Sequence, residues 1–457
     1  MVFSEQLVEQ DQYRIVLVLP QSKMVLAERH GETLRLPSVK IPRWARPAEQ
    51  LTKAIRERWN LPAMVIDRLP AEADLLPCAV VEVCMPATQN IPDGLVSDDL
   101  DAIAASEISK PEHAVVRGIL SGDVGARGPF SRIGWLQEAQ LWIQESIVDH
   151  SIEFTEDIRQ LNANGTFALV RFGTAQGPAY WLKATGAPNS HEFGITTTLA
   201  EYFPESLPPF VAARADWNAW VTAEAGKPLY DNLTLPALEQ AVFALAQLQK
   251  QSAGCIEQLL HRGFSRQGIP ILQSQLNDLI DYLEEAMEQQ TTTRVSRLES
   301  SQLRELGRVL HDACSEMHEL GIPDALAHLD INPGNVLFDG ARCVFIDWAE
   351  AYIGNPFLTF EQFLSHVERS GTPANSWVSH LRDIYAQSWF DFLSESNIDR
   401  AFTLAPLLAV ATYLYGRGDW LHAPRRHDPA FQSYARSLAR HMYRAAQATN
   451  LMEPSCR

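Results

Sequence analysis

The fold of this chain is decided by residues 327–357, which read AHLDINPGNVLFDGARCVFIDWAEAYIGNPF. The stretch places His328, Asp330 and Asn335 in an H-x-D-x-x-x-x-N arrangement, and Asp347 follows in an Ile-Asp-Trp triplet. One carboxylate can accept or orient the proton of an attacking hydroxyl, while an amide oxygen and a second carboxylate hold Mg²⁺ against nucleotide phosphates. The pattern therefore predicts Mg-dependent phosphoryl transfer from ATP or GTP to a small molecule.

The composition sets the broad class of the protein. The 457 residues are 46% apolar and 21% charged, as in an ordinary globular protein of about two to four domains. A formal charge of -18 argues against non-specific binding to nucleic acid or anionic lipid. That charge fits a cationic substrate, but it fits plain acidic solubility as well.

The cysteines and the N-terminal sequence indicate the cellular compartment. The six cysteines are scattered without a C-x-x-C pair, so reduced thiols are expected rather than a metal site or a disulfide framework. Residues 1–14 are acidic where a signal peptide would be basic, and the apolar run 404–415 is too short to span a bilayer. We expect a cytoplasmic protein with no membrane and no nucleic-acid partner; the oligomeric state stays open.

Three regions are distinguishable along the chain. Strand-like runs at 13–19, 24–27 and 78–85, with a helix starting near Pro47, predict an N-terminal α/β region. Within it, residues 86–113 look like a loop or insertion, and residues 136–147 like an amphipathic closing segment. The second region predicts antiparallel strands at 167–172, 180–184, 210–214 and 219–223, with a helix over 190–203. The third is mostly helical, because apolar residues recur at helical spacing over 238–248 and 303–317.

The two motifs, in this order and followed by Gly-Asn-Pro-Phe at 354–357, resemble the aminoglycoside phosphotransferase and choline kinase superfamily, whose fold is that of protein kinases. The resemblance covers about residues 150–450. It implies an α+β, protein-kinase-like bilobal fold with a small antiparallel β lobe at 149–225 and a large helical lobe at 226–457. A separate α/β domain at 1–148 precedes it.

The resemblance also assigns roles by position. Asp330 is expected to be the catalytic base or hydroxyl-orienting carboxylate, and Asn335 and Asp347 the Mg²⁺ ligands. His328 is expected to pack beneath the loop rather than to titrate. The family usually has Gly between the His and the Asp, where this sequence has Leu329; the change affects loop packing and removes no reacting group.

Nucleotide contacts follow from the same resemblance. Lys183 occupies the place of the strand lysine that binds phosphates, and Glu192 is its expected ion-pair partner, with Glu201 as the fallback. Residues 220–226 read as the hinge, where backbone groups near Ala223 and Ala225 would bond the base of ATP, or of GTP. Residues 161–166 are either a phosphate-covering loop or an ordinary turn.

The N-terminal order of two strands, a short Leu-Arg-Leu-Pro run and a helix resembles a Nudix hydrolase fold. Only Arg56 and Glu57 of the Nudix box are present, so its metal-binding glutamates are missing and no diphosphate hydrolysis is expected. Another kind of α/β domain remains an equal alternative.

The acceptor is not specified by the sequence. Candidate contacts to an amine or a sugar are Glu350, Glu361, Asp419 and Trp420, whereas Arg425, Arg426 and His427 would suit an anionic acceptor. The favoured function is a small-molecule kinase acting on a hydroxyl. Its rival is a catalytically silent pseudokinase that senses a nucleotide or ligand, and protein-kinase activity is disfavoured because no A-P-E signature follows Asp347.

Overall fold

The fold is described from a computed structural model, which covers residues 9–43, 45–69, 75–84, 90–123, 127–147, 152–371, 375–416 and 424–452. The contacts within the chain divide it into two units. The N-terminal unit comprises Met1–Phe193 and Pro209–Glu224, and the C-terminal unit comprises Gly194–Pro208 and Ala225–Arg457. Each unit is described by itself.

The N-terminal unit begins with a seven-stranded mixed sheet of order β3-β2-β1-β6-β5, in which β4 pairs with β1 and β7 with β2. The pairing of β1 with β6 is parallel and the other pairings are antiparallel. Its strands are β1 (Gln10–Val18), β2 (Val25–His30), β3 (Thr33–Arg35), β4 (Ser38–Pro42), β5 (Ala63–Leu69), β6 (Cys78–Val83) and β7 (Leu95–Asp98). The accompanying helices are α1 (Pro47–Trp59) and α2 (Lys110–Ser121).

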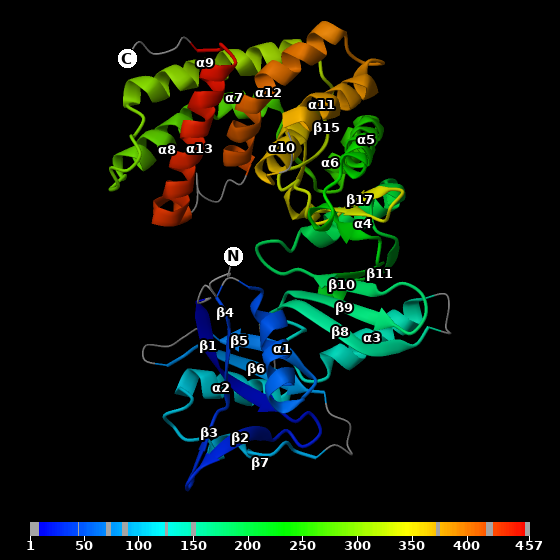
Figure 1. The fold of residues 1–457 in the computed structure, drawn as a ribbon, viewed down its shortest axis with the longest axis vertical. Helices are drawn as coiled ribbons and strands as arrows, with labels where there is room; N and C mark the ends of the chain where they lie inside the picture. Colours follow the sequence, from blue (N-terminus) through cyan, green and yellow to red (C-terminus); the bar gives the residue numbers. More distant parts are fainter. Residues whose placement is uncertain are drawn as a thin grey trace, which may run out of the picture. The chain divides into compact units, whose positions relative to one another are not determined.

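A second, antiparallel sheet of the same unit has the order β11-β12-β10-β9-β8, and Figure 1 shows β8, β9 and β10 lying side by side. Its strands are β8 (Phe154–Ala163), β9 (Ala168–Thr174), β10 (Tyr180–Ala184), β11 (Phe210–Arg214) and β12 (Ala219–Ala223). Buried and partly exposed residues alternate along β10, so one face of the sheet is buried. The side chains of α3 (Trp135–Ser146) and of Phe130 pack in the core on that face. The antiparallel strands expected from the sequence in this region are confirmed.

Gln160 joins the two sheets of the N-terminal unit. Its buried side-chain amide accepts a hydrogen bond from the Val65 backbone N–H and donates one to the Val65 carbonyl, both at 2.8 Å. Val65 lies in β5 and Gln160 in β8, so the Gln160 side chain satisfies both backbone hydrogen-bonding groups of Val65, as a paired strand would, where the two sheets meet. The two sheets therefore form one packed body.

One N-terminal expectation is wrong. Residues 86–113 are expected from the sequence to form a loop or insertion, and the loop reading is wrong because they contain β7 and the start of α2; residues 85–89 lie outside the described part. The helix starts there because Ser109 and Glu112 form a reciprocal capping box that satisfies two backbone N–H groups. The structure also adds β5, which the sequence patterns did not reveal. The Nudix-like assignment stays an unconfirmed prediction.

The C-terminal unit is mainly helical, as expected. Its helices are α4 (Glu192–Tyr202, of which the first two residues fall in the N-terminal unit), α5 (Leu235–Ala253), α6 (Ile256–His261), α7 (Ile269–Ser274), α8 (Leu276–Glu288), α9 (Ser300–Glu319), α10 (Pro356–Arg369), α11 (Asn375–Trp389), α12 (Glu395–Gly416) and α13 (Pro429–Ala448). Two small sheets complete it, with orders β13-β16-β17 and β14-β18-β15. Their strands are β13 (Lys227–Pro228), β14 (Ser265–Arg266), β15 (Ala325–His328), β16 (Val336–Phe338), β17 (Cys343–Phe345) and β18 (Ala351–Gly354).

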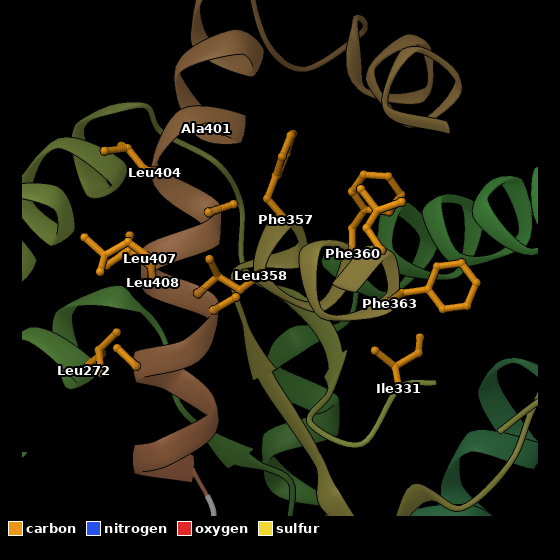
Figure 2. Packing of buried hydrophobic residues seen from close by; sticks show 14 of the residues in the cluster. Leu272, Ile331, Phe357, Leu358, Phe360, Phe363, Ala401, Leu404, Leu407 and Leu408 are labelled. Atoms are coloured by element: carbon orange, nitrogen blue, oxygen red, sulfur yellow. The ribbon is translucent and has the colours of Figure 1, made fainter. Parts of the chain in front are cut away.

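The core of this unit forms where α10 meets α12. Phe357, Phe360 and Phe363 of α10 are fully or almost fully buried, and Leu404, Leu407 and Leu408 of α12 belong to the same cluster. Figure 2 shows Leu358 of α10 next to α12, whose Leu404 and Leu407 point to the other side, where Leu272 lies. Ile331 lies below Phe363 in the same view and belongs to the loop that carries the H-x-D motif. Burying each such side chain contributes about 1.5–3 kcal/mol, so the motif loop is held by the main core of the unit.

Two further expectations concern membranes and cysteines. Within the described ranges, none of the helices has the length and apolar character needed to cross a membrane. Cys78, Cys84, Cys255, Cys314 and Cys343 are free thiols, as expected, and Cys456 lies outside the described residues.

Candidate active site

The motif loop follows β15 and brings Asp330 and Asn335 together. The Asn335 side-chain amide donates to the Asp330 carbonyl at 2.9 Å and to Asp330 Oδ2 at 3.3 Å. These two bonds orient the amide nitrogen toward Asp330, so Oδ1 of Asn335 is the atom suited to bind a cation. The spacing of five residues thus produces a carboxylate and an amide oxygen side by side.

His328 holds this loop in shape. It is 2% exposed, and its Nδ1 accepts a hydrogen bond from the Asp330 backbone N–H at 3.1 Å. Its Nε2 lies 3.2 Å from the Ile346 carbonyl, to which it donates in the neutral tautomer that both contacts require. Its ring also lies against Trp348, with centroids 4.9 Å apart. The expected packing role is confirmed.

Asn332 is a loop-positioning residue that the sequence reasoning missed. Its side chain donates to the Asp330 carbonyl at 3.0 Å and accepts from the Gly334 N–H at 2.8 Å. A Cβ on Gly334 would meet the ring of Tyr230 at 3.2 Å, so the loop also rests on an aromatic side chain. The Asn-Pro-Gly turn at 332–334 was the available signal for Asn332.

Asp347 lies at the end of β17 with φ 66° and ψ 55°, in the left-handed region. Few non-glycine residues adopt this conformation, and such strain gathers at functional sites. The Ile346 N–H donates to the Asn335 carbonyl at 3.0 Å, which ties the residue before Asp347 to the motif loop. The structure therefore links the backbone positions of Asn335 and Asp347.

Leu329, which replaces the usual glycine, is accommodated by packing. It is 4% exposed and clusters with Ala327 and Tyr352. A Cβ on Gly416 of α12 would collide with its side chain, so the glycine in the helix leaves room for the leucine in the loop. The departure from the family pattern does not disturb Asp330.

Lys183 and Glu192 form the predicted ion pair in the N-terminal unit. Lys183 Nζ lies 2.5 Å from Glu192 Oε1, and Glu192 is 1% exposed. The ammonium also lies over the Trp220 ring at 5.6 Å. Glu201, the fallback partner, instead pairs with Arg262 at 3.3 Å.

The hinge residues differ in what their backbones can offer. The Ala223 N–H is already donated to the Pro209 carbonyl at 2.9 Å, so it is not a donor for a nucleotide base. Among the described residues, no backbone hydrogen bond is found for Ala225. Gly226 has φ 109°, and a Cβ there would collide with Phe338 of β16. Glycine is thus required where the chain enters the helical unit.

The possible phosphate loop at 161–166 is an ordinary turn. Asn164 Oδ1 accepts from the backbone N–H groups of Thr166 and Phe167 at 2.9 and 2.7 Å, so both groups are used within the turn. Gly165 is buried, its carbonyl accepts from the Phe130 N–H at 3.1 Å, and a Cβ would collide with Arg127. These bonds favour the ordinary turn, one of the two readings that the sequence left open.

The acceptor candidates divide into three groups. Glu361 is buried and bound by Arg382 at 2.9 Å, while Arg426 and His427 both bind Glu285 of α8, so these contacts serve the structure. Burial raises the pKa of Glu361. Glu350 lies in the turn after Asp347, where its carbonyl accepts the Leu329 N–H at 3.1 Å. Asp419, Trp420 and the Arg425 side chain lie outside the described residues.

Mg²⁺ fits the donor set of the C-terminal unit. Within the part of the chain that the structure describes, no group of three or more His, Cys, Asp or Glu side chains could hold a metal by itself. Mg²⁺ does not need such a cage, since it is commonly held by one or two protein oxygens together with substrate phosphates and water. Asn335 and Asp347 offer that smaller set.

Comparison with known proteins now adds to this geometry. Residues 218–374 match the model of the phosphotransferase enzyme family, a segment that contains the motif loop, Asp347 and α10. The resemblance is confirmed for this part of the chain. The match supports, for residues 218–374, the small-molecule phosphotransferase expected from the sequence. None of the curated proteins matches the chain.

Several solved structures are similar at low identity. A macrolide 2'-phosphotransferase from Brachybacterium faecium is 14% identical over 70% of this chain and 99% of its own, with a TM-score of 0.43. An ethanolamine kinase from Plasmodium vivax is 14% identical over 76% and 96%, with a TM-score of 0.46. The GDP complex of an aminoglycoside 2'-phosphotransferase is 15% identical over 67% and 98%, with a TM-score of 0.43. These likenesses are too weak to select a substrate.

Proposed function

We propose that this protein transfers the γ-phosphate of ATP, with Mg²⁺, to a hydroxyl group of a small molecule. The observation that carries the proposal is the pairing of Asp330 with Asn335 in the loop after β15, bonded through the backbone to the residue before Asp347. GTP is the alternative phosphoryl donor.

Each residue has a distinct part in the proposed reaction. Asp330 aligns the acceptor hydroxyl and accepts its proton as the phosphoryl group leaves the nucleotide. Oδ1 of Asn335 and the carboxylate of Asp347 are the proposed Mg²⁺ ligands. The bound metal and nucleotide supply charge neutralisation and the group to be transferred.

The nucleotide-binding part of the proposal rests on Lys183. Glu192 fixes the direction of the ammonium, which is the arrangement that kinases use to hold nucleotide phosphates. Ala225 is the proposed hinge contact to the base, and Ala223 can contribute at most its carbonyl, because its N–H is already bonded. We retain 149–225 as the small lobe, 226–457 as the large lobe and 1–148 as a preceding domain.

A pseudokinase remains the second candidate because the turn at 164–167 uses the N–H groups of Thr166 and Phe167 for its own hydrogen bonds, which removes these two donors for phosphates. Against it, all four residues that pseudokinases tend to lose are present, namely Lys183, Asp330, Asn335 and Asp347.

A labelled-phosphate transfer assay separates the two candidates. The protein is incubated with Mg²⁺ and γ-labelled ATP against a panel of aminoglycosides, macrolides, amino alcohols and sugars. We expect transfer to at least one class, and Asp330→Ala to reduce turnover by about 10²–10⁴-fold with little change in ATP affinity. Asp281→Ala, on the exposed face of α8, is the matched control. Full transfer by Asp330→Ala would refute the assigned role.

A further inference from the structure

A cavity of about 930 Å³ lies within the N-terminal unit, and none of its lining residues belongs to the motif loop. Its walls come from the end of α1, the facing parts of β5 and β6, the start of α3 and the start of β8. Pockets for small molecules are typically 300–1,000 Å³ and combine apolar walls with a few placed polar groups. The cavity has this size, and its lining mixes apolar side chains with a larger share of polar ones.

Glu82 is the unusual residue of this cavity. It lies in β6, whose six residues are all buried, and it is 8% exposed between Val81 and Val83. One of its oxygens, Oε2, accepts the Gly134 N–H at 2.9 Å. A neutral glutamine could accept the same bond, so the contact with Gly134 does not explain why a charged side chain is buried here.

The surroundings leave the Glu82 carboxylate without a close cation. In the described ranges, no Lys, Arg or His nitrogen lies within 4.0 Å of it, and the nearby Arg132 is paired with Glu138. Burial raises the pKa of Glu82, which reflects the missing partner. A second carboxylate, Glu156, lines the cavity, and Arg56 is its one lining cation in the described residues. The lining therefore carries net negative charge.

The remaining walls suit a hydrocarbon body. Met64, Leu136 and Phe154 offer apolar and aromatic surface, while Asn60, Gln137 and Gln140 add amide groups. A ligand would match the whole lining if it placed a positive charge near Glu82, an aliphatic chain along these walls and hydrogen-bonding groups at the amides.

We propose that this cavity is a binding site for a small organic amine, with the ammonium group paired to Glu82. None of the lining residues is one of the proposed phosphotransfer residues, and the proposal does not depend on their function. Four of its lining residues lie in β8, the edge strand of the sheet that carries Lys183 in β10. An occupant would thus contact both sheets of the N-terminal unit, which Gln160 joins a few residues further along β8.

The test uses three amines without hydroxyl groups, putrescine, agmatine and tetramethylammonium, because none of them can serve as the hydroxyl acceptor of the proposed kinase reaction. Calorimetric titration of the full chain at pH 8 is expected to show binding of at least one. Glu82→Gln keeps an acceptor for the Gly134 N–H and should weaken binding at least tenfold without lowering the melting temperature. Glu153→Gln, an exposed residue just before β8 that does not line the cavity, is the control with the same loss of charge and should bind as the wild type.

Two further readouts locate the site. Hydrogen exchange should slow on adding the amine at residues 62–64, 82–84, 134–140 and 154–158. Binding should strengthen as pH rises through the raised pKa of Glu82, because only the ionised carboxylate pairs with an ammonium. Among the described residues, the other titratable groups near Glu82 are Glu156, Arg56, Arg132 and Cys84. No binding of any of the three amines, equal binding by Glu82→Gln, or protection confined to other segments would overturn the proposal.

Discussion

Asp347 combines backbone strain with a proposed metal-binding role, so the two can be separated by substitution. Glycine adopts φ 66° without the cost that a Cβ imposes, although it adds entropy to the unfolded chain. We expect Asp347→Gly to unfold within about 1 kcal/mol of the wild type and yet to lose Mg-dependent nucleotide binding. Thermal unfolding and nucleotide titration of the same sample check both statements. A variant that binds normally would show that the carboxylate is not a metal ligand.

At the same scale, the H-x-D-x-x-x-x-N motif indicated that Asp330 and Asn335 act together, and their side chains are bonded. The packing of His328 and the ion pair of Lys183 with Glu192 followed from the resemblance to kinases. The engaged N–H of Ala223 and the internal bonds of Asn164 did not, because they depend on which neighbouring backbone lies within reach. Sequence order does not record such local competition.

Among the elements, the connection from β12 to β13 depends on Gly226, and a matched glycine isolates the reason. Gly226 and Gly340 have similar φ angles of 109° and 103°, but only a Cβ at Gly226 would meet other atoms. Gly340→Ala should cost about 1 kcal/mol from backbone strain, and Gly226→Ala about 2 kcal/mol or more because the collision with Phe338 adds to it. Thermal melting of both variants gives the comparison. Equal melting temperatures would mean that the close approach to β16 is not needed.

Element boundaries in the small lobe were predictable because alternating apolar residues and turns mark each strand; β11 and β12 fall at the predicted residues. The elements of segment 86–113 could not be predicted in this way, because its strand is short and its residues are polar. The pair Ser109 and Glu112 was a readable signal for the start of α2, because a Ser followed by Glu three residues later is typical of a helix start.

For the whole molecule, the packing of the N-terminal unit predicts that the kinase-like part is not self-sufficient when cut at residue 148. Phe130 and Trp135 are each 1% exposed and cover one face of the five-stranded sheet together with α3. A fragment of residues 149–457 would expose that face, so we expect it to aggregate and bind hydrophobic dyes. A fragment of residues 127–457 keeps α3 and should be more soluble. Equal solubility and melting of both fragments would contradict this packing account.

This dependence was not visible in the sequence. The patterns predicted an N-terminal α/β region and a separate antiparallel lobe, and each pattern describes only its own segment. The junction instead relies on single side chains, such as Gln160 against Val65 and Gly165 against residues 127–131, whose partners lie far away in the sequence. Periodicity carries no information about such contacts.

The most direct test of the proposed kinase activity is calorimetric titration of the full chain with ATP, with and without Mg²⁺, and with GTP in parallel. We predict binding that requires Mg²⁺ and that Asp347→Gly loses, because Asn335 and Asp347 would hold the metal against the phosphates. Absence of nucleotide binding under every condition would contradict the account and leave the protein as a pseudokinase.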